Sequence, residues 1–179
     1  MHLACMGYSL NALLGREHLK YLYRAMARDA TCYVGVAFTG NRPTGVISGS
    51  LDAGRLTSRL MMRMPLGRLL SMARRLLLHP HLVGLWWKGN QIALPIRIDS
   101  KEVRAVLTAI VVDPSAQGRG VGRALVGAFE KFLRDAAVPA YRLDTQIANH
   151  PANQFYRGQG FEEAARRADS IVFVRRLGQ

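Results

Sequence analysis

One short segment limits the fold of this chain more than any other. Residues 111–125, VVDPSAQGRGVGRAL, lead from a β-branched run into an apolar run with helical spacing. Between the two runs the loop reads Gln117-Gly118-Arg119-Gly120-Val121-Gly122-Arg123. Glycines let a backbone approach an anion closely, and the unpaired N–H groups at a helix N-terminus attract negative charge. The segment therefore predicts a strand, a loop and a helix, with either a pyrophosphate site or a ligand-free turn between them.

Two common phosphate-binding motifs do not fit this loop. The P-loop needs G-x-x-x-x-G-K-[ST], and no glycine here is followed by Lys and then Ser or Thr at that spacing. The dinucleotide fingerprint G-x-G-x-x-G would place its last glycine at Arg123 or at Leu125. Neither a P-loop nucleotide site nor a Rossmann dinucleotide site is therefore expected.

The remaining hydrophobic patterns predict an α/β protein. Before residue 53 they predict one helix and a β-hairpin, over residues 16–28, 31–38 and 44–52. After residue 97 they predict three strands, over residues 103–113, 140–147 and 170–177. A helix that ends near residue 135 and a short helix capped by Asn149 separate those strands.

The chain is strongly basic, and one section carries most of the excess. Its 25 Lys and Arg against 12 Asp and Glu give a net charge of +13, which favours anionic partners. Between residues 53 and 97 there are eight basic residues and no acidic one: Arg55, Arg59, Arg63, Arg68, Arg74, Arg75, Lys88 and Arg97. Pro65 divides this section into two short helices, and the second has Arg68, Ser71 and Arg75 on one face. That face is either solvated or a contact surface for a membrane, an acidic protein or an anionic substrate.

The amino-acid composition limits the kinds of site, the location and the partners that we expect for this protein. Two cysteines, Cys5 and Cys32, are too few for a disulfide framework or a four-ligand metal site, and the five histidines show no metal-binding spacing. We therefore expect free thiols, no metal and a cytoplasmic location. No run reaches the roughly 18 apolar residues that cross a bilayer. The basic residues alternate with Leu and Met rather than with stacking aromatics, so nucleic-acid binding is not expected.

Two motifs, in order along the chain, resemble the GNAT superfamily of N-acetyltransferases. The family motif Q/R-x-x-G-x-G/A is filled by Gln117, Gly120 and Gly122. The family pattern N-x-x-A-x-x-F/L-Y-x-x-x-G-F is matched by Asn149, Ala152, Phe155, Tyr156, Gly160 and Phe161. The resemblance implies one acetyltransferase domain with a mixed, mostly antiparallel central sheet flanked by helices. Its parts are an αββ acceptor side, a basic helical insertion and an acetyl-CoA-binding core, over residues 1–52, 53–97 and 98–179.

The resemblance also implies roles for individual residues. Backbone amides of the loop would bind the acetyl-CoA pyrophosphate, with Arg123 beside them: Gln117, Gly118, Arg119, Gly120, Val121 and Gly122. The pantetheine arm would pair with the strand near Ile110 and Val112, and Asn149 would contact CoA. Tyr156 occupies the place of the general acid that protonates the leaving thiolate. The base is open among Asp52, Asp99, Glu102, Asp144 and His150, with Thr108 able to order a water.

The implied activity is acetyl transfer from acetyl-CoA to a primary amine of a small molecule or peptide, by direct attack in a ternary complex. The basic section at residues 53–97 would wall the acceptor site and favour an anionic acceptor. The alternatives are a non-catalytic CoA-binding or membrane-associated module, and an acyltransferase that uses acyl carrier protein. The basic section could contact a membrane surface, and the chain could form a homodimer; the sequence leaves both open.

Overall fold

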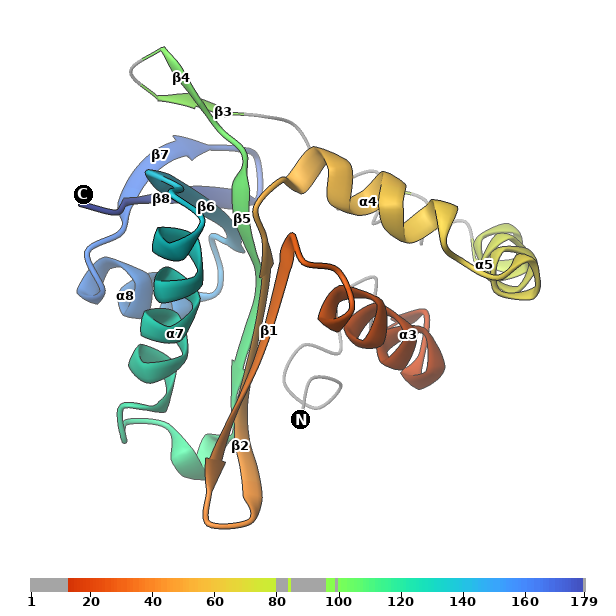
Figure 1. Ribbon diagram of the computed structural model, residues 1–179, viewed down its shortest axis with the longest axis horizontal. Helices are drawn as coiled ribbons and strands as arrows, with labels where there is room; N and C mark the ends of the chain where they lie inside the picture. Colours follow the sequence, from red (N-terminus) through yellow and green to blue (C-terminus); the bar gives the residue numbers. More distant parts are fainter. Residues whose placement is uncertain (1–12, 80–83, 85–95, 99, 179) are drawn as a thin grey trace.

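The chain forms one central sheet with helices on both sides (Figure 1). The computed structural model describes residues 13–79, 84, 96–98 and 100–178. The six strands of the sheet run in the order β1-β2-β5-β6-β8-β7. Their bounds are β1 (Cys32–Thr39), β2 (Arg42–Ser50), β5 (Ala105–Val112), β6 (Ala140–Gln146), β7 (Glu162–Arg166) and β8 (Ser170–Arg176).

The helices lie on opposite sides of the sheet. In Figure 1, α7 and α8 lie on one side, and α3, α4 and α5 lie on the other. Their bounds are α3 (Arg16–Ala27), α4 (Ala53–Met62), α5 (Leu66–Leu78), α7 (Val121–Asp135) and α8 (His150–Gly158), with a 3-10 turn η2 at Pro114–Ala116. A separate hairpin consists of β3 (Ile96–Ile98) and β4 (Lys101–Val103).

The sheet is antiparallel everywhere except between β5 and β6, and that junction is short. The two parallel strands pair only at Ala105 with Tyr141 and at Val106 with Arg142. Beyond these pairs the strands separate: β5 continues along β2 as far as Val112, and β6 continues along β8. The predicted mixed, mostly antiparallel sheet is confirmed. The separation leaves the facing edges of β5 and β6 without a strand between them.

The core lies between the sheet and α7. Of the apolar positions along this helix, Leu125, Phe129 and Leu133 are buried, and Phe129 and Leu133 have no exposed surface. The Phe129 ring meets the Tyr141 ring edge-on, with the centroids 5.4 Å apart. Gly49 on β2 allows the Phe129 ring to pack against the sheet, because a Cβ at this position would lie 2.4 Å from Cζ of Phe129. The helix that carries the glycine loop is thus seated directly on β2.

Most predicted elements are confirmed, and two differences have clear causes. Strand β7 was not expected, because its sequence EEAAR has no apolar alternation and all five residues are exposed at the sheet edge. Pro65 does divide two helices, α4 and α5, but Ile96 and Arg97 belong to the β3–β4 hairpin. Residues 96–97 are therefore not helical, and whether residues 53–97 are an insertion stays a prediction. A strand before the first helix would fall within residues 1–12, outside the described residues.

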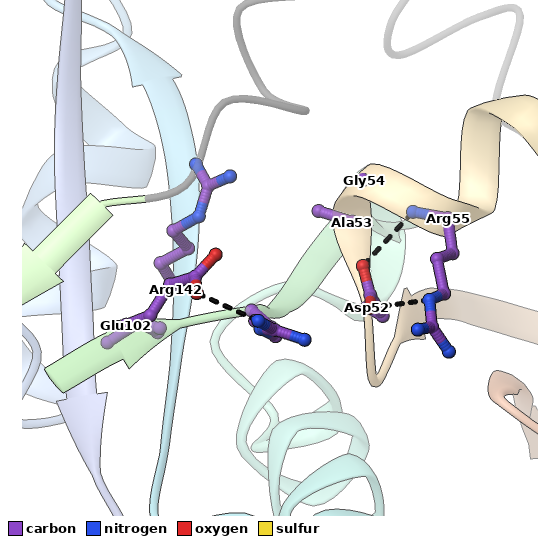
Figure 2. Close-up of a pocket in the computed structure, with 8 residues that line it drawn as sticks. Asp52, Ala53, Gly54, Arg55, Glu102 and Arg142 are labelled. Carbon is purple, nitrogen blue, oxygen red and sulfur yellow. Dashed lines mark hydrogen bonds and ion pairs between the residues drawn. The ribbon is translucent and has the colours of Figure 1, made fainter.

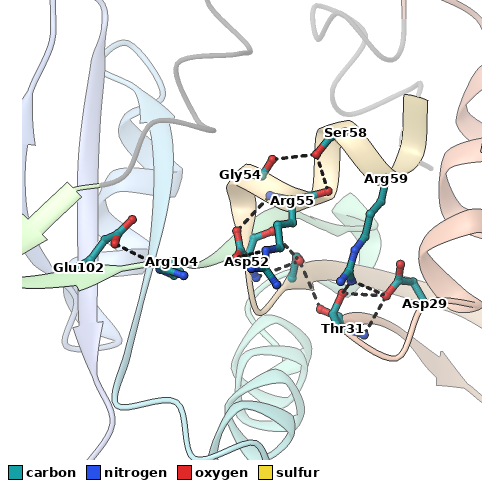
Figure 3. A network of polar contacts seen from close by, with 10 residues as sticks. Asp29, Thr31, Asp52, Gly54, Arg55, Ser58, Arg59, Glu102 and Arg104 are labelled. Atoms are coloured by element: carbon teal, nitrogen blue, oxygen red, sulfur yellow. Dashed lines mark hydrogen bonds and ion pairs between the residues drawn. The ribbon is translucent and has the colours of Figure 1, made fainter. Parts of the chain in front are cut away.

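Several arginines of the basic section contact the rest of the domain, and Figure 3 shows Arg55 and Arg59 among them. Asp29 accepts hydrogen bonds from the N–H and Oγ1 of Thr31, at 3.0 and 2.7 Å. It also pairs with Arg59 and Arg63 of α4 and its C-cap, at 3.5 and 3.3 Å. Arg68 of α5 donates to the Glu17 carbonyl at 2.9 Å. Arg68, one of the residues on the predicted basic face, thus contacts α3 through its guanidinium.

Candidate active site

The separation of β5 and β6 opens into a cavity of about 680 Å³. Its lining comes from the later part of β5, the glycine loop, the first turn of α7, the last residues of β6 and α8. The volume lies within the range of about 300–1,000 Å³ that small-molecule sites occupy. Elements distant in the sequence thus meet around one space.

The glycine loop forms one end of this cavity. Gly118 and Gly120 have φ angles of 74° and 81°, in the region that favours glycine. A Cβ on either would meet no atom within 4 Å, so the glycines serve the backbone conformation rather than packing. Gly120 is the N-cap of α7 and provides no side-chain cap. The first N–H groups of α7 are therefore available to an anion.

Nearly all the predicted site residues line this cavity. They are Ile110, Val112, Gln117, Gly118, Gly120, Val121, Gly122, Arg123, Asn149 and Tyr156. Arg119 lies in the same loop and is exposed, but it is not part of the lining. The fold therefore brings the two sequence motifs together around one space.

Two asparagines fix the start of α8 beside the cavity. Asn149 is the N-cap, and its Oδ1 accepts a hydrogen bond from the Ala152 N–H at 3.3 Å. Asn153 is buried, and its Nδ2 donates to the carbonyls of Gln146 and Ile147 at 3.1 and 3.0 Å. Sequence reasoning missed Asn153. The signal was its helical spacing, four residues after the cap and three before Tyr156, which puts an amide on the buried face of the helix.

Tyr156 lies in α8 between the cavity and the core. Its side chain is 7% exposed and lines the cavity. Its ring meets the rings of Phe155 and Phe161, with both centroid distances 5.4 Å. These aromatic contacts hold the ring in one place, so the position of the phenol is set by the core.

Asp144 brings a carboxylate to the same cavity. It lies on β6, its side chain is 8% exposed, and it lines the cavity with Tyr156. Arg142 and Arg167 pair with it at 3.3 and 3.1 Å. Burial raises the pKa of the Asp144 carboxyl above its ordinary value, and the Arg167 and Arg142 guanidinium groups oppose that rise. A carboxyl with a raised pKa in a cavity is a candidate acid–base group.

The other candidate bases lie elsewhere. Figure 2 shows Asp52 and Glu102 in a second cavity of about 200 Å³, where α4 begins and β4 leads into β5. Asp52 accepts a hydrogen bond from the Arg55 N–H at 3.0 Å, and Glu102 accepts one from Arg104 Nη2 at 2.9 Å. His150 is exposed and does not line the main cavity. Asp99 is outside the described residues.

Thr108 lies at a bulge where β5 borders the cavity. The β2–β5 register shifts between Ser48, opposite Ala109, and Gly49, opposite Leu107, so Thr108 is the additional residue. Its hydroxyl donates to the Ser48 carbonyl at 3.0 Å and contacts the Ser48 hydroxyl at 2.9 Å. Thr108 lines the cavity, and its side chain is held by the neighbouring strand.

Residues 8–161 match the profile of the Acetyltransferase (GNAT) family. The chain belongs to this family. Among curated acetyltransferases, the Thermomonospora curvata mycothiol acetyltransferase is 44% identical over 54 residues, which are 30% of this chain and 18% of that protein. The Stenotrophomonas maltophilia aminoglycoside N(6')-acetyltransferase type 1 is 40% identical over 64 residues, 36% of this chain and 39% of that protein. The similarity thus spans well under two thirds of either relative.

Solved structures share the acetyltransferase fold. The protein named SsHAT has a TM-score of 0.64 and 26% identity, over 80% of this chain and 72% of that chain. A candidate streptothricin acetyltransferase from Bacillus anthracis str. Ames, in complex with acetyl coenzyme A, has a TM-score of 0.54 and 16% identity. That match covers 87% of this chain and 67% of that chain. The second likeness concerns the fold alone.

The main cavity meets the chemical requirements of acetyl-CoA, the acetyl donor of GNAT acetyltransferases. A pyrophosphate needs backbone N–H donors without obstructing side chains, and the loop at Gly118 and Gly120 offers open space. A pantetheine arm needs free backbone partners, and the separated edges of β5 and β6 provide them. The residues of this acetyltransferase are therefore compatible with the donor.

The helices and the potential metal ligands of this GNAT chain add two structural facts. Over residues 13–79, 84, 96–98 and 100–178, every helix is too short or too polar to cross a lipid bilayer. Within the same ranges, no three side chains of His, Cys, Asp or Glu gather as a metal site requires. Cys32 is a half-buried free thiol, and Cys5 lies outside the described residues.

Proposed function

We propose that this chain is an N-acetyltransferase that moves an acetyl group from acetyl-CoA to a primary amine while both substrates are bound. The observation that carries the proposal is a single cavity lined by the glycine loop, a buried carboxyl and a buried phenol. Acetyl-CoA supplies the acetyl group as an activated thioester. The chain must then bind an anionic donor, accept a proton from an amine and donate one to a leaving sulfur.

The glycine loop is proposed to hold the donor. Backbone N–H groups of the loop after Gln117 would bind the pyrophosphate, and the open space at Gly118 and Gly120 leaves room for it. The Gln117 N–H itself donates to the Pro114 carbonyl at 3.4 Å. Arg123, exposed in the first turn of α7, adds a charge-assisted contact. Ile110 and Val112 offer backbone groups along β5, and Asn149 offers its amide at the start of α8. Arg119, which is exposed and does not line the cavity, is proposed to contact the donor from outside the cavity.

Tyr156 and Asp144 are proposed to move the two protons. Tyr156 carries a phenol, which can donate a proton to the leaving sulfur. An alkylamine is largely protonated at the same pH and needs a base. Among the predicted bases, Asp144 alone lines the cavity within the described residues, and its raised pKa improves its ability to accept a proton. Arg142 and Arg167 hold its carboxylate in position.

The acceptor is proposed to be an amine that also carries negative charge. The net charge of +13 disfavours a polycationic acceptor, although one relative is named as an aminoglycoside acetyltransferase. Three arginines on the α3 and α4 side are bound to Asp29 or to α3, so they shape that side as a rigid basic wall: Arg59, Arg63 and Arg68. An amino acid, a phosphorylated amine or a nucleotide sugar with a free amine fits such a wall.

Thermal melting with CoA tests the donor site first. A ligand that binds only the native state raises the melting temperature. We expect saturating CoA to stabilise the wild-type chain, and Arg123→Glu to weaken that effect. An unchanged melting temperature of the wild-type chain in saturating CoA contradicts the donor site.

Thiol release from acetyl-CoA across a panel of amines tests the chemistry. We expect Tyr156→Phe to lower kcat by about 10²-fold or more, with CoA still bound. Because the pKa of Asp144 is raised, the acid limb of kcat/KM should lie above an ordinary carboxyl pKa, and Asp144→Asn should remove it. Asp135→Asn, an exposed carboxyl paired with Lys131 at the end of α7, is the control. CoA binding without thiol release with any amine would leave a CoA-binding module instead.

A further inference from the structure

The exposed large apolar side chains of the described residues gather on one helix and its approach. Eight such side chains are more than a third exposed, and five of them lie between the end of α4 and the end of α5. They are Met62 at 85%, Leu66 at 71%, Leu70 at 63%, Leu77 at 83% and Leu78 at 63% exposure. We call Leu66, Leu70, Leu77 and Leu78 the outer leucine face. A contiguous apolar surface of this kind indicates a contact that the isolated domain does not fill.

Helical geometry explains why core packing does not account for this face. Leu66, Leu70 and Leu77 recur at i, i+4 and i+11, on one side of α5. The opposite side is half-buried and includes Leu69, Met72 and Leu76. Arg68, on that inner side, donates to the Glu17 carbonyl and lies 5.4 Å from the centre of the Tyr21 ring. The helix is therefore attached through one side and presents leucines on the other.

Positive charge accompanies the outer leucine face. Residues 53–78 contain six arginines and no acidic residue. Arg74 lies on the same helical row as Leu70 and Leu78, four residues from each, and is exposed. Among the described residues no ion pair or hydrogen bond holds Arg74. Leucines beside unneutralised arginine on a helix of high net positive charge are typical of helices that lie on membrane surfaces.

We propose that the outer leucine face docks on the surface of an anionic lipid bilayer. The leucines enter the boundary between headgroups and acyl chains, and Arg74 and its neighbours bind lipid phosphates. A second copy of this chain is disfavoured as the occupant, because two faces of the same positive sign repel. In Figure 1, α5 projects from the far end of α4, on the side of the sheet opposite α7 and α8. A bilayer can therefore reach α5 without covering those helices. The proposal does not depend on the proposed reaction.

Vesicle co-sedimentation of the full chain tests the proposal. The vesicles contain equal parts of phosphatidylglycerol and phosphatidylcholine, or phosphatidylcholine alone. We expect binding to the anionic vesicles that weakens with salt, and at least about tenfold weaker binding for Leu70→Glu/Leu77→Glu. Arg74→Gln should weaken binding about fivefold. The charge-matched control is Val36→Glu/Phe38→Glu on β1, whose side chains are 49% and 61% exposed; it should retain most of the binding.

Each other outcome overturns the proposal. Equal losses in the two double variants mean that net charge alone attracts the chain to lipid. No binding of the wild-type chain to anionic vesicles assigns the face to another partner, such as an acidic protein. A dimer in gel filtration that Leu70→Glu/Leu77→Glu dissociates assigns the face to a second copy. Melting curves accompany each variant, and Leu77→Glu alone, at the 83% exposed position, repeats the test if the double variant unfolds.

Discussion

Gly49 on β2 is the position where a single added methyl group should disturb the domain most. A Cβ built on Gly49 lies 2.4 and 2.6 Å from Cζ and Cε2 of Phe129, and 2.7 Å from the carbonyl oxygen of Val106. Phe129 is fully buried, and Val106 belongs to the neighbouring strand. The ring cannot yield without displacing α7, and the carbonyl cannot yield without displacing β5. Gly49→Ala therefore strains the contact between the helix and the sheet.

The size of the effect follows from these contacts. Overpacking a core costs typically 1–3 kcal/mol, and two rigid neighbours place Gly49→Ala at about 3 kcal/mol. For a chain of 179 residues, each kcal/mol lowers the melting temperature by about 2–4 °C, so we expect a fall of about 6–12 °C. Gly127→Ala, in the exposed interior of α7, meets nothing within 4 Å and should stabilise the chain by about 0.5–1 kcal/mol.

Thermal and urea denaturation measure both variants. In a Phe129→Leu background the clash with the ring is relieved, so the additional cost of Gly49→Ala should be clearly smaller. The reasoning fails if Gly49→Ala melts like the wild-type chain. It fails also if its cost is the same in both backgrounds, because the ring would then not be the obstacle.

Three further predictions concern polar contacts. Asn153→Ala removes two hydrogen bonds to the backbone at the end of β6. The substitution should lower the free energy of unfolding by about 1–2 kcal/mol and raise the Kd for CoA. An unchanged Kd would mean that Asn153 does not support the CoA site. Hydrogen bonds from Thr31 hold the pKa of Asp29 below its ordinary value, so its carboxylate stabilises the fold above that value and the benefit disappears as the pH falls through the native pKa. Asp29→Asn should therefore lose about 1 kcal/mol near neutral pH and nothing in strong acid. Burial raises the pKa of Asp144, so the wild-type chain should lose stability relative to Asp144→Asn as the pH rises from the ordinary carboxyl pKa; a flat difference would contradict its burial.

Apolar spacing and short motifs in the sequence predicted the helices whose formation depends on neighbouring residues. The apolar positions of α7 and the motif from Asn149 to Phe161 each predicted a helix, and the family resemblance implied the mixed, mostly antiparallel sheet. Strand β7 was missed because β8, rather than its own sequence, provides its pairing. The contact of Arg68 with α3 could not be predicted, because helical spacing shows which residues share a face but not which face meets another helix.

Some residues of the candidate site could also be predicted from the sequence, and others could not. The loop glycines and Tyr156 could be predicted from the sequence because each belongs to one of the two family motifs. The sequence could not single out Asp144 from the four other candidate bases. Asp144 and Tyr156 line one cavity only because of how β6 and α8 are placed in the fold. Its pairing with Arg167 also joins residues 23 positions apart. Such choices need the tertiary structure.

The brief contact between β5 and β6 has a consequence for how such a chain can change. Each half of the sheet, β1-β2-β5 and β6-β8-β7, keeps its own hydrogen-bonded ladder, and only two residue pairs join them. Substitutions on the α3 and β1 side therefore need no matching register change in the half that follows β6. A chain built in this way can vary the surface of α3 and β1 while the β6-β8-β7 ladder keeps its register.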